Sequence, residues 1–186
     1  MSEITVTTVT PEAWAAFKSV RLEALRDSPE AFSATYGEEA AFSDDEWVAR
    51  VERAPRFIAY RDGAVVGTAS LGVHEADDET DDRLAEGFDS GLGEIFGLWV
   101  TPLARGTGVA TALARAGAKR AQQDGRSHVV YWVSTDNGRA VAFASGLGFR
   151  PTDSRRPMRG SNHASEEEIA MILPLGADRG TLPDLG

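Results

Sequence analysis

Cysteine is absent from the 186 residues of this chain, and histidine occurs only three times. Without a thiol the chain can form no disulfide bond, no cysteine nucleophile and no thiolate metal site. The histidines, His74, His128 and His163, lie far apart and lack the spacing typical of metal ligands. The sequence therefore predicts a domain that binds no metal.

Long apolar stretches are also missing. No run approaches the roughly 20 residues that a membrane-spanning helix needs. The first residues, MSEITVTTV, have neither the basic and apolar regions of a secretory signal nor the composition of a transit peptide. The chain length suits one compact domain with a sizeable core. We expect a cytoplasmic protein with no membrane partner.

Basic residues are scarce, with 19 Lys and Arg against 29 Asp and Glu. The imbalance lies in residues 1–100, which carry a net charge of −13, whereas residues 101–186 carry +3. An acidic protein repels the phosphates of nucleic acids, so we expect no nucleic acid partner. The asymmetry indicates differently charged partners for the two halves, with a simple gain in solubility as an equal alternative.

Six short segments have the β-branched and aromatic composition of strands. Two of them, Arg56–Arg61 and Ala64–Val73, flank the dipeptide Asp62-Gly63, which is typical of a tight hairpin. The other four expected strands are Ile4–Val9, Glu94–Val100, His128–Val133 and Glu168–Leu173. The sequence leaves open whether a further strand follows Phe149.

Helix signals fall between these strands. Thr10, followed by proline and glutamate, predicts an N-cap and the first turn of a helix. Ser43 and Glu46 have the spacing of a capping box. The expected helices are residues 11–26, a second one that begins after Ser43, residues 107–123, and residues 137–145.

The order of these elements predicts a mixed αβ domain of the α+β class, with one central mixed sheet and helices on both faces. We expect residues 1–175 to form this single domain and residues 176–186 to form a frayed tail. Residues 74–93 contain eight acidic groups without periodicity, and we expect a mobile surface loop there.

A glycine-containing hexapeptide, Arg105-Gly106-Thr107-Gly108-Val109-Ala110, lies between an expected strand and an expected helix. Glycines let the backbone turn sharply and approach a ligand without a Cβ atom in the way. The amides of the first helical turn would then point at an anion such as a pyrophosphate. The motif is neither a P-loop nor a dinucleotide fingerprint. By itself it is equally compatible with a plain strand-to-helix turn.

Two motifs together resemble the GNAT superfamily of acyl-CoA N-acyltransferases. The first is a strand and proline followed by the family's loop pattern, here Leu98-Trp99-Val100-Thr101-Pro102 and then Arg105, Gly108 and Ala110. The second is the later Asn-x-x-Ala and Gly-Phe pattern, here Asn137, Ala140, Gly148 and Phe149. The resemblance covers nearly all of residues 4–175, and it implies a GNAT-like fold with acetyl-CoA as co-substrate.

The resemblance also implies a set of cofactor contacts. The loop from Arg105 to Ala110, which includes Gly106, Thr107, Gly108 and Val109, would bind the CoA pyrophosphate through backbone amides. The strand residues Leu98, Trp99 and Val100 would hydrogen-bond the pantetheine arm, and Asn137 would contact the same arm. For Asn137 a pure helix N-cap is an equal alternative, and for Trp99 a core position is the commoner role.

The implied reaction is acetyl transfer to a primary amine, whose pKa near 10.4 makes deprotonation at pH 7 cost roughly 4–5 kcal/mol. The resemblance assigns the base to Glu94, with a solvated strand-end charge as the alternative. Many relatives have a tyrosine at the position of Ala144, taken as the acid that protonates the thiolate. Ser145 could hydrogen-bond the sulfur instead, and Tyr131 is a second substitute, although both residue types at such positions are more often structural.

The acceptor is not encoded in a readable motif. Phe32 and Tyr36 are candidates for the substrate pocket, with simple packing as an equal alternative. The expected partner is a small-molecule or peptide amine that meets acetyl-CoA in a ternary complex. Two other functions stay open: a non-catalytic acyl-CoA sensor and a transferase for a longer acyl group. The oligomeric state is open as well, with a homodimer as one alternative.

Overall fold

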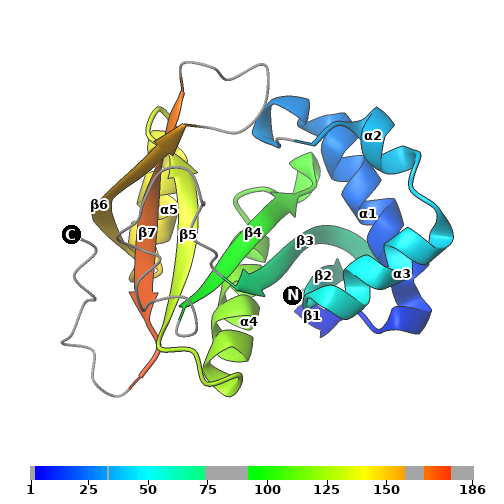
Figure 1. Cartoon of the computed structure of the whole chain (residues 1–186), viewed down its shortest axis with the longest axis horizontal. Helices are drawn as coiled ribbons and strands as arrows, with labels where there is room; N and C mark the ends of the chain where they lie inside the picture. The colour runs from blue at the N-terminus through cyan, green and yellow to red at the C-terminus, as the bar shows by residue number, and fades with distance from the viewer. Residues whose placement is uncertain (1–2, 33, 74–91, 158–165, 177–186) are drawn as a thin grey trace. The chain divides into compact units, whose positions relative to one another are not determined.

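The computed structural model describes residues 3–32, 34–73, 92–157 and 166–176 (Figure 1). The strands are β1 (Ile4–Thr8), β2 (Arg56–Arg61), β3 (Ala64–Val73), β4 (Leu92–Val100), β5 (His128–Ser134), β6 (Arg150–Pro157) and β7 (Glu167–Pro174). The α-helices are α1 (Trp14–Asp27), α2 (Tyr36–Ala40), α3 (Asp44–Arg53), α4 (Val109–Gln123) and α5 (Gly138–Gly146). Three short 3-10 helices lie at η1 (Pro11–Ala13), η2 (Pro29–Ala31) and η3 (Pro102–Ala104).

The strands form one mixed sheet in the order β1-β2-β3-β4-β5-β7-β6. β4 and β5 run parallel, whereas β1 and β2, β2 and β3, β5 and β7, and β6 and β7 pair antiparallel. This arrangement confirms the predicted fold class, a mixed sheet with helices. By their contacts the residues divide into two compact units. The first holds the chain up to Leu71 together with Gly97–Gly117, and the second holds the rest of the described chain.

The first unit has helices on both faces of its strands. On one face the side chains of α1 and α3 form a core with Ile58 of β2, and Trp47 of α3 is fully buried there. Phe17 of α1 meets the Trp47 ring edge-on at 5.8 Å between centroids. On the other face α4 packs against Gly67 of β3, where an added Cβ would lie 3.1 Å from Val109 Cγ1 and 2.7 Å from the Trp99 carbonyl oxygen. Gly67 therefore sets how closely α4 and β4 approach β3.

The second unit is built on β5 and β7. Leu92, Val130, Ala170 and Ile172 form a buried cluster on one face of its strands. α5 contacts β5 and β6 (Figure 1), and β4 joins the unit through pairs such as Glu94 with Val130. Among the described residues no helix is long and apolar enough to cross a membrane.

Several sequence predictions agree with the elements in detail. The hairpin strands β2 and β3 have the predicted bounds, with Asp62 and Gly63 at positive φ in the turn. The capping box is confirmed, because the Ser43 side chain accepts from the amide of Glu46 while the Glu46 carboxylate accepts from the amide of Ser43. The strand left open after Phe149 is present as β6.

Other predictions were wrong in detail. Thr10 makes no side-chain capping bond, and the first turn after it is the 3-10 helix η1 rather than α-helix. α4 begins at Val109 instead of residue 107, because the loop glycines before it have positive φ. The expected loop 74–93 was two residues too long, since Leu92 and Gly93 are buried in β4. Its residues 74–91, and residues 177–186 of the expected tail, lie outside the described residues.

Candidate active site

The predicted glycine loop connects η3 to α4 in the first unit. Gly106 has φ +75° and Gly108 has φ +93°, conformations that L-residues with a Cβ atom adopt only with strain. The carbonyl of Gly108 accepts from the amide of Ala112 at 3.0 Å, so the helical bonding pattern begins at Gly108. The amides of the first helical turn have no acceptor within the helix. Together with the helix dipole they make this end of α4 suitable for an anionic group.

Arg105 fixes the start of this loop. Its Nε donates to the carbonyl oxygen of Val100 at 3.0 Å, and its Nη2 donates to Oδ2 of Asp27 at 2.8 Å. The same carboxylate oxygen accepts from Ser28 Oγ at 2.7 Å and from the indole Nε1 of Trp99 at 3.0 Å. Hydrogen bonds from Ser28 and Trp99, followed by the charge of Arg105, hold the pKa of Asp27 below its usual 3.8.

The middle of the loop is held from β2. Arg61 Nη2 donates to Thr107 Oγ1 at 2.8 Å, and the Thr107 hydroxyl donates to the carbonyl oxygen of Ala104. Arg61 and Asp27 were not singled out in the sequence. Neither belongs to a motif, and each lies more than 40 residues before its loop partner.

The end of β4 has a buried and a partly accessible part. Leu98 is partly buried, whereas Trp99 and Val100 are buried. The Trp99 side chain packs in the core formed by α1 and α3, which agrees with the core alternative. Any contact of Trp99 with the pantetheine arm would therefore come from its backbone.

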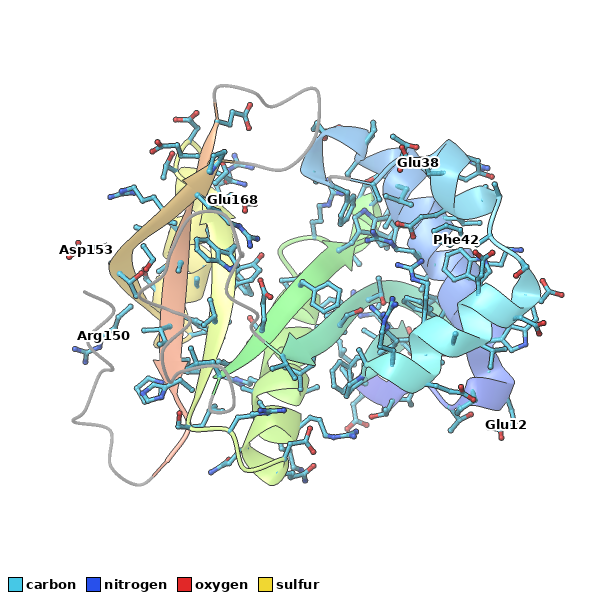
Figure 2. All side chains as sticks on the ribbon, in the orientation of Figure 1. Glu12, Glu38, Phe42, Arg150, Asp153 and Glu168 are labelled. Carbon is cyan, nitrogen blue, oxygen red and sulfur yellow. The ribbon has the colours of Figure 1, made fainter. Side chains whose placement is uncertain are left out.

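Glu94 lies on β4 within the second unit, and its side chain is 19% exposed. Arg156 of β6 brings its Nη2 to 3.9 Å from Glu94 Oε1 and donates from Nε to Oε2 of Glu168 at 2.9 Å. The Arg156 guanidinium also lies 4.1 Å from the centroid of the Trp132 ring. Glu168, near the start of β7, is labelled in Figure 2. Arg156 is thus held by a carboxylate and an aromatic ring.

Strand alternation does not extend from Glu94 to Leu98, because Gly97 interrupts it with φ +62°. A Cβ at Gly97 would lie 3.6 Å from Arg21 Nη1. Glu94 and Leu98, four residues apart, are therefore not related by simple strand alternation.

The second motif forms the start of α5 and the turn after it. Asn137 is the N-cap of α5, and its Oδ1 accepts from the amide of Ala140 at 3.1 Å. Ala144 is completely buried, whereas Ser145 is exposed. Burial, and next the charge of Glu168, raise the pKa of Tyr131 to about 12. Tyr131 is partly buried and packs edge-on against Phe149 at 6.2 Å, so it has a packing role.

Of the two predicted acceptor residues, Phe32 lies between α1 and α2 and Tyr36 is the first residue of α2, and both contact arginines of α1. The Arg21 guanidinium lies 4.9 Å from the centroid of the Phe32 ring. The Arg26 guanidinium lies 4.7 Å from the Tyr36 ring and donates to the Tyr36 hydroxyl at 2.7 Å. Phe32 is partly buried against the core, and Tyr36 is 36% exposed.

A buried carboxylate organises these helices. Glu39 of α2 is 3% exposed and accepts from Arg21 at 3.0 Å twice and from Arg50 of α3 at 2.7 Å. Burial opposes ionisation of Glu39, but the hydrogen bonds and charges of Arg21 and Arg50 outweigh it and hold the pKa below 4.5. The neighbouring Arg56 is almost fully buried, and this burial lowers its pKa to about 9. Sequence reasoning missed this network, since α2 itself was not predicted.

Comparison with known proteins identifies the family. Residues 20–149 match the Acetyltransferase (GNAT) family, so the chain belongs to that family. The resemblance carried by the glycine loop and the second motif is therefore confirmed.

Solved structures agree on the fold. The structure of yncA from Salmonella typhimurium with its cofactor acetyl-CoA superposes with a TM-score of 0.70 at 19% identity, covering 94% of this chain and 95% of that one. An N-acetyltransferase from Staphylococcus aureus Mu50 gives a TM-score of 0.71 at 17% identity over 94% of this chain and 100% of that one. At such identities the likeness concerns the fold alone.

Curated relatives are similar in sequence but longer. A mycothiol acetyltransferase of Parafrankia sp. (strain EAN1pec) is 33% identical over 160 residues, which is 82% of this chain and 48% of the relative. A mycothiol acetyltransferase of Frankia casuarinae is 36% identical over 152 residues, which is 78% of this chain and 41% of the relative. The chain thus spans about half the length of these relatives, and the reaction of the whole protein is a proposal.

Proposed function

We propose that the protein transfers the acetyl group of acetyl-CoA directly to a primary amine in a ternary complex. The observation that carries this proposal is the loop at the start of α4, where Gly106 and Gly108 have positive φ. Such a loop allows a phosphate group to approach the backbone amides of the first helical turn. Membership in the GNAT acetyltransferase family supports the same ligand.

The proposed acetyl-CoA site is built mainly from backbone. Amides from Gly106 to Ala110 bind the pyrophosphate, and the α4 dipole adds a favourable field. The backbone of Leu98–Val100 pairs with the pantetheine arm like an additional strand. Asn137 already caps α5 through Oδ1, so in this proposal its contact with the arm uses the amide nitrogen.

Glu94 is the proposed general base. The amine nitrogen can attack the thioester carbonyl carbon only after it loses a proton, and Glu94 accepts that proton directly or through water. Arg156, with Nη2 at 3.9 Å, favours the ionised carboxylate, which is the form that a base needs. Glu168 shares the same guanidinium and so reduces its pull on Glu94.

The nitrogen–carbon bond forms as the carbon–sulfur bond breaks, the thiolate of CoA leaves, and the second proton lost by the nitrogen passes to the thiolate or to solvent. Tyr131 is a poor proton donor for this step, because a phenol with a pKa of about 12 holds its proton tightly. A thiol has a pKa near 8.5, so its anion leaves without full protonation. Ser145, exposed on α5, is proposed to donate a hydrogen bond to the sulfur.

Phe32 and Tyr36 are proposed to contact the acceptor. Their rings are held by Arg21 and Arg26, which reduces the freedom that the rings would lose on binding. The names of the curated relatives support a small-molecule acceptor. A peptide amine is the other acceptor class that the assay below includes.

Release of CoA thiol tests the proposal. The chain has no cysteine, so the protein itself adds no thiol background to a reagent that detects CoA. Purified protein is mixed with acetyl-CoA and a panel of thiol-free small-molecule and peptide amines. An acceptor that carries its own thiol, as the names of the curated relatives indicate, is followed by mass spectrometry of the acetylated product instead. Amine-dependent thiol release supports the proposal. Binding of acetyl-CoA without thiol release for any amine would instead favour a sensor. Faster thiol release from a longer acyl-CoA would mean that the transferred group is longer than acetyl.

A further inference from the structure

We propose that Asp27 is a positioning residue for acetyl-CoA binding, because its carboxylate holds Arg105 and thereby the entry of the glycine loop. The inference rests on the proposed function of that loop. It assigns a role in the cofactor site to a residue of the first helix, 78 residues before its loop partner.

The geometry of Asp27 is the main argument. A single oxygen, Oδ2, accepts hydrogen bonds from three segments: Ser28 after α1 at 2.7 Å, the indole of Trp99 in β4 at 3.0 Å, and Arg105 at 2.8 Å. Ser28 Oγ also lies 3.5 Å from Arg105 Nη2. The carboxylate therefore ties the end of α1, the end of β4 and the start of the loop to one point.

Arg105 is hydrogen-bonded to β4 as well as to Asp27. Its Nε donates to the Val100 carbonyl oxygen while its Nη2 donates to Asp27, so the fork of the guanidinium spans β4 and α1. Only one residue separates Arg105 from Thr107, whose hydroxyl and carbonyl contact Arg61. The backbone of Gly106 is thus held on both sides by side chains, which favours a preformed loop.

A purely electrostatic role of Asp27 predicts the opposite effect on binding. A carboxylate near a pyrophosphate site repels the ligand, so loss of its charge would strengthen the binding of acetyl-CoA. If Asp27 acts by positioning Arg105, loss of the charge weakens binding, because the loop must then be ordered when the ligand binds. The sign of the change distinguishes the two roles.

The experiment compares Asp27→Asn with Asp124→Asn by calorimetric titration with acetyl-CoA. Asp124 also pairs with an arginine, Arg120 at 3.1 Å, but it lies beyond the opposite end of α4 from the loop. We expect the Kd of Asp27→Asn to rise about tenfold, as for loss of a charge-assisted hydrogen bond. Asp124→Asn should keep the wild-type Kd. A Kd for Asp27→Asn equal to or below the wild-type value would overturn the inference.

A double-mutant cycle tests whether Asp27 acts through Arg105. If it does, Asp27→Asn adds little to the effect of Arg105→Gln, whereas additive effects would contradict the inference. Amide hydrogen exchange at residues 105–108 without ligand provides a second readout, and it should be faster in Asp27→Asn than in Asp124→Asn.

Two further measurements keep the result interpretable. Thermal unfolding of each variant shows whether the fold is retained. If Asp27→Asn does not fold, Arg105→Lys keeps the positive charge but loses the planar fork, and it should weaken acetyl-CoA binding by a similar factor; an unchanged Kd would reject the inference. Failure of the wild-type protein to bind acetyl-CoA would instead reject the proposed function itself.

Discussion

Nη2 of Arg156 lies 3.9 Å from Oε1 of Glu94, and both side chains are about one-fifth exposed. The same guanidinium is hydrogen-bonded to Glu168 at 2.9 Å. One cation is thus shared by two carboxylates, one of which is the proposed base. A neighbouring cation favours the ionised form of a carboxylate.

Replacing Arg156 should therefore change the pH dependence of catalysis. In Arg156→Gln the Glu94 carboxylate loses a stabilising cation and becomes protonated at higher pH. The acid limb of the profile of kcat/KM against pH should therefore move to higher pH. Arg120→Gln, which removes an exposed guanidinium from α4, should leave the limb in place. An unmoved limb in Arg156→Gln would show that Arg156 does not influence the base.

Glu94→Gln tests the base directly. The amide cannot accept a proton, so kcat should fall about 10²- to 10⁴-fold. The Kd of acetyl-CoA should change little, since the proposed cofactor contacts lie elsewhere. Glu167→Gln on the exposed start of β7 is the matched control and should keep the wild-type kcat. Activity of Glu94→Gln within a few-fold of wild type would remove Glu94 from the mechanism.

Gly108→Ala should weaken acetyl-CoA binding. Alanine at φ +93° is strained by about 1–2 kcal/mol, so the loop either shifts or binds with that penalty. A Kd increase of about tenfold corresponds to such an energy. Gly125→Ala introduces comparable strain at φ +80° after the other end of α4. Equal Kd values for the two variants would mean that the loop conformation does not matter for binding.

Turns and helix caps, which depend only on residues close together in the sequence, could be predicted from local patterns. The turn at Asp62-Gly63 and the capping box at Ser43 and Glu46 were predicted correctly, because each feature depends on residues within a few positions of one another. The glycine loop could also be placed between its strand and its helix for this reason. These local signals were sufficient for the fold class and for the proposed cofactor loop.

The partners of the site residues were not predictable. The bond between Trp99 and Asp27 joins residues 72 positions apart, and no local pattern encodes it. Helix α2 was missed because only five residues form it. Its Glu39 looks like a surface residue in the sequence, and only the approach of Arg21 and Arg50 compensates its burial.

Glu39 should make folding stability depend on pH. Its folded-state pKa is below 4.5, so its contribution is fully present above that value and is lost as the pH falls through the folded pKa. Glu39→Gln leaves two partly buried guanidinium groups without their carboxylate and should lower the free energy of unfolding at pH 7 by about 3 kcal/mol. Denaturant unfolding from pH 7 to pH 3 measures both effects. Equal slopes of stability against pH in wild type and Glu39→Gln would contradict this role.

Calorimetric titration of the wild-type protein with acetyl-CoA, with ATP as a comparison ligand, tests the central claim most directly. We predict one site with a Kd of about 1 μM, which corresponds to roughly −8 kcal/mol, weaker binding of ATP, and a clear loss of affinity in Gly108→Ala. No binding of acetyl-CoA up to millimolar concentration would contradict the claim, and the glycine loop would then be a structural turn between β4 and α4.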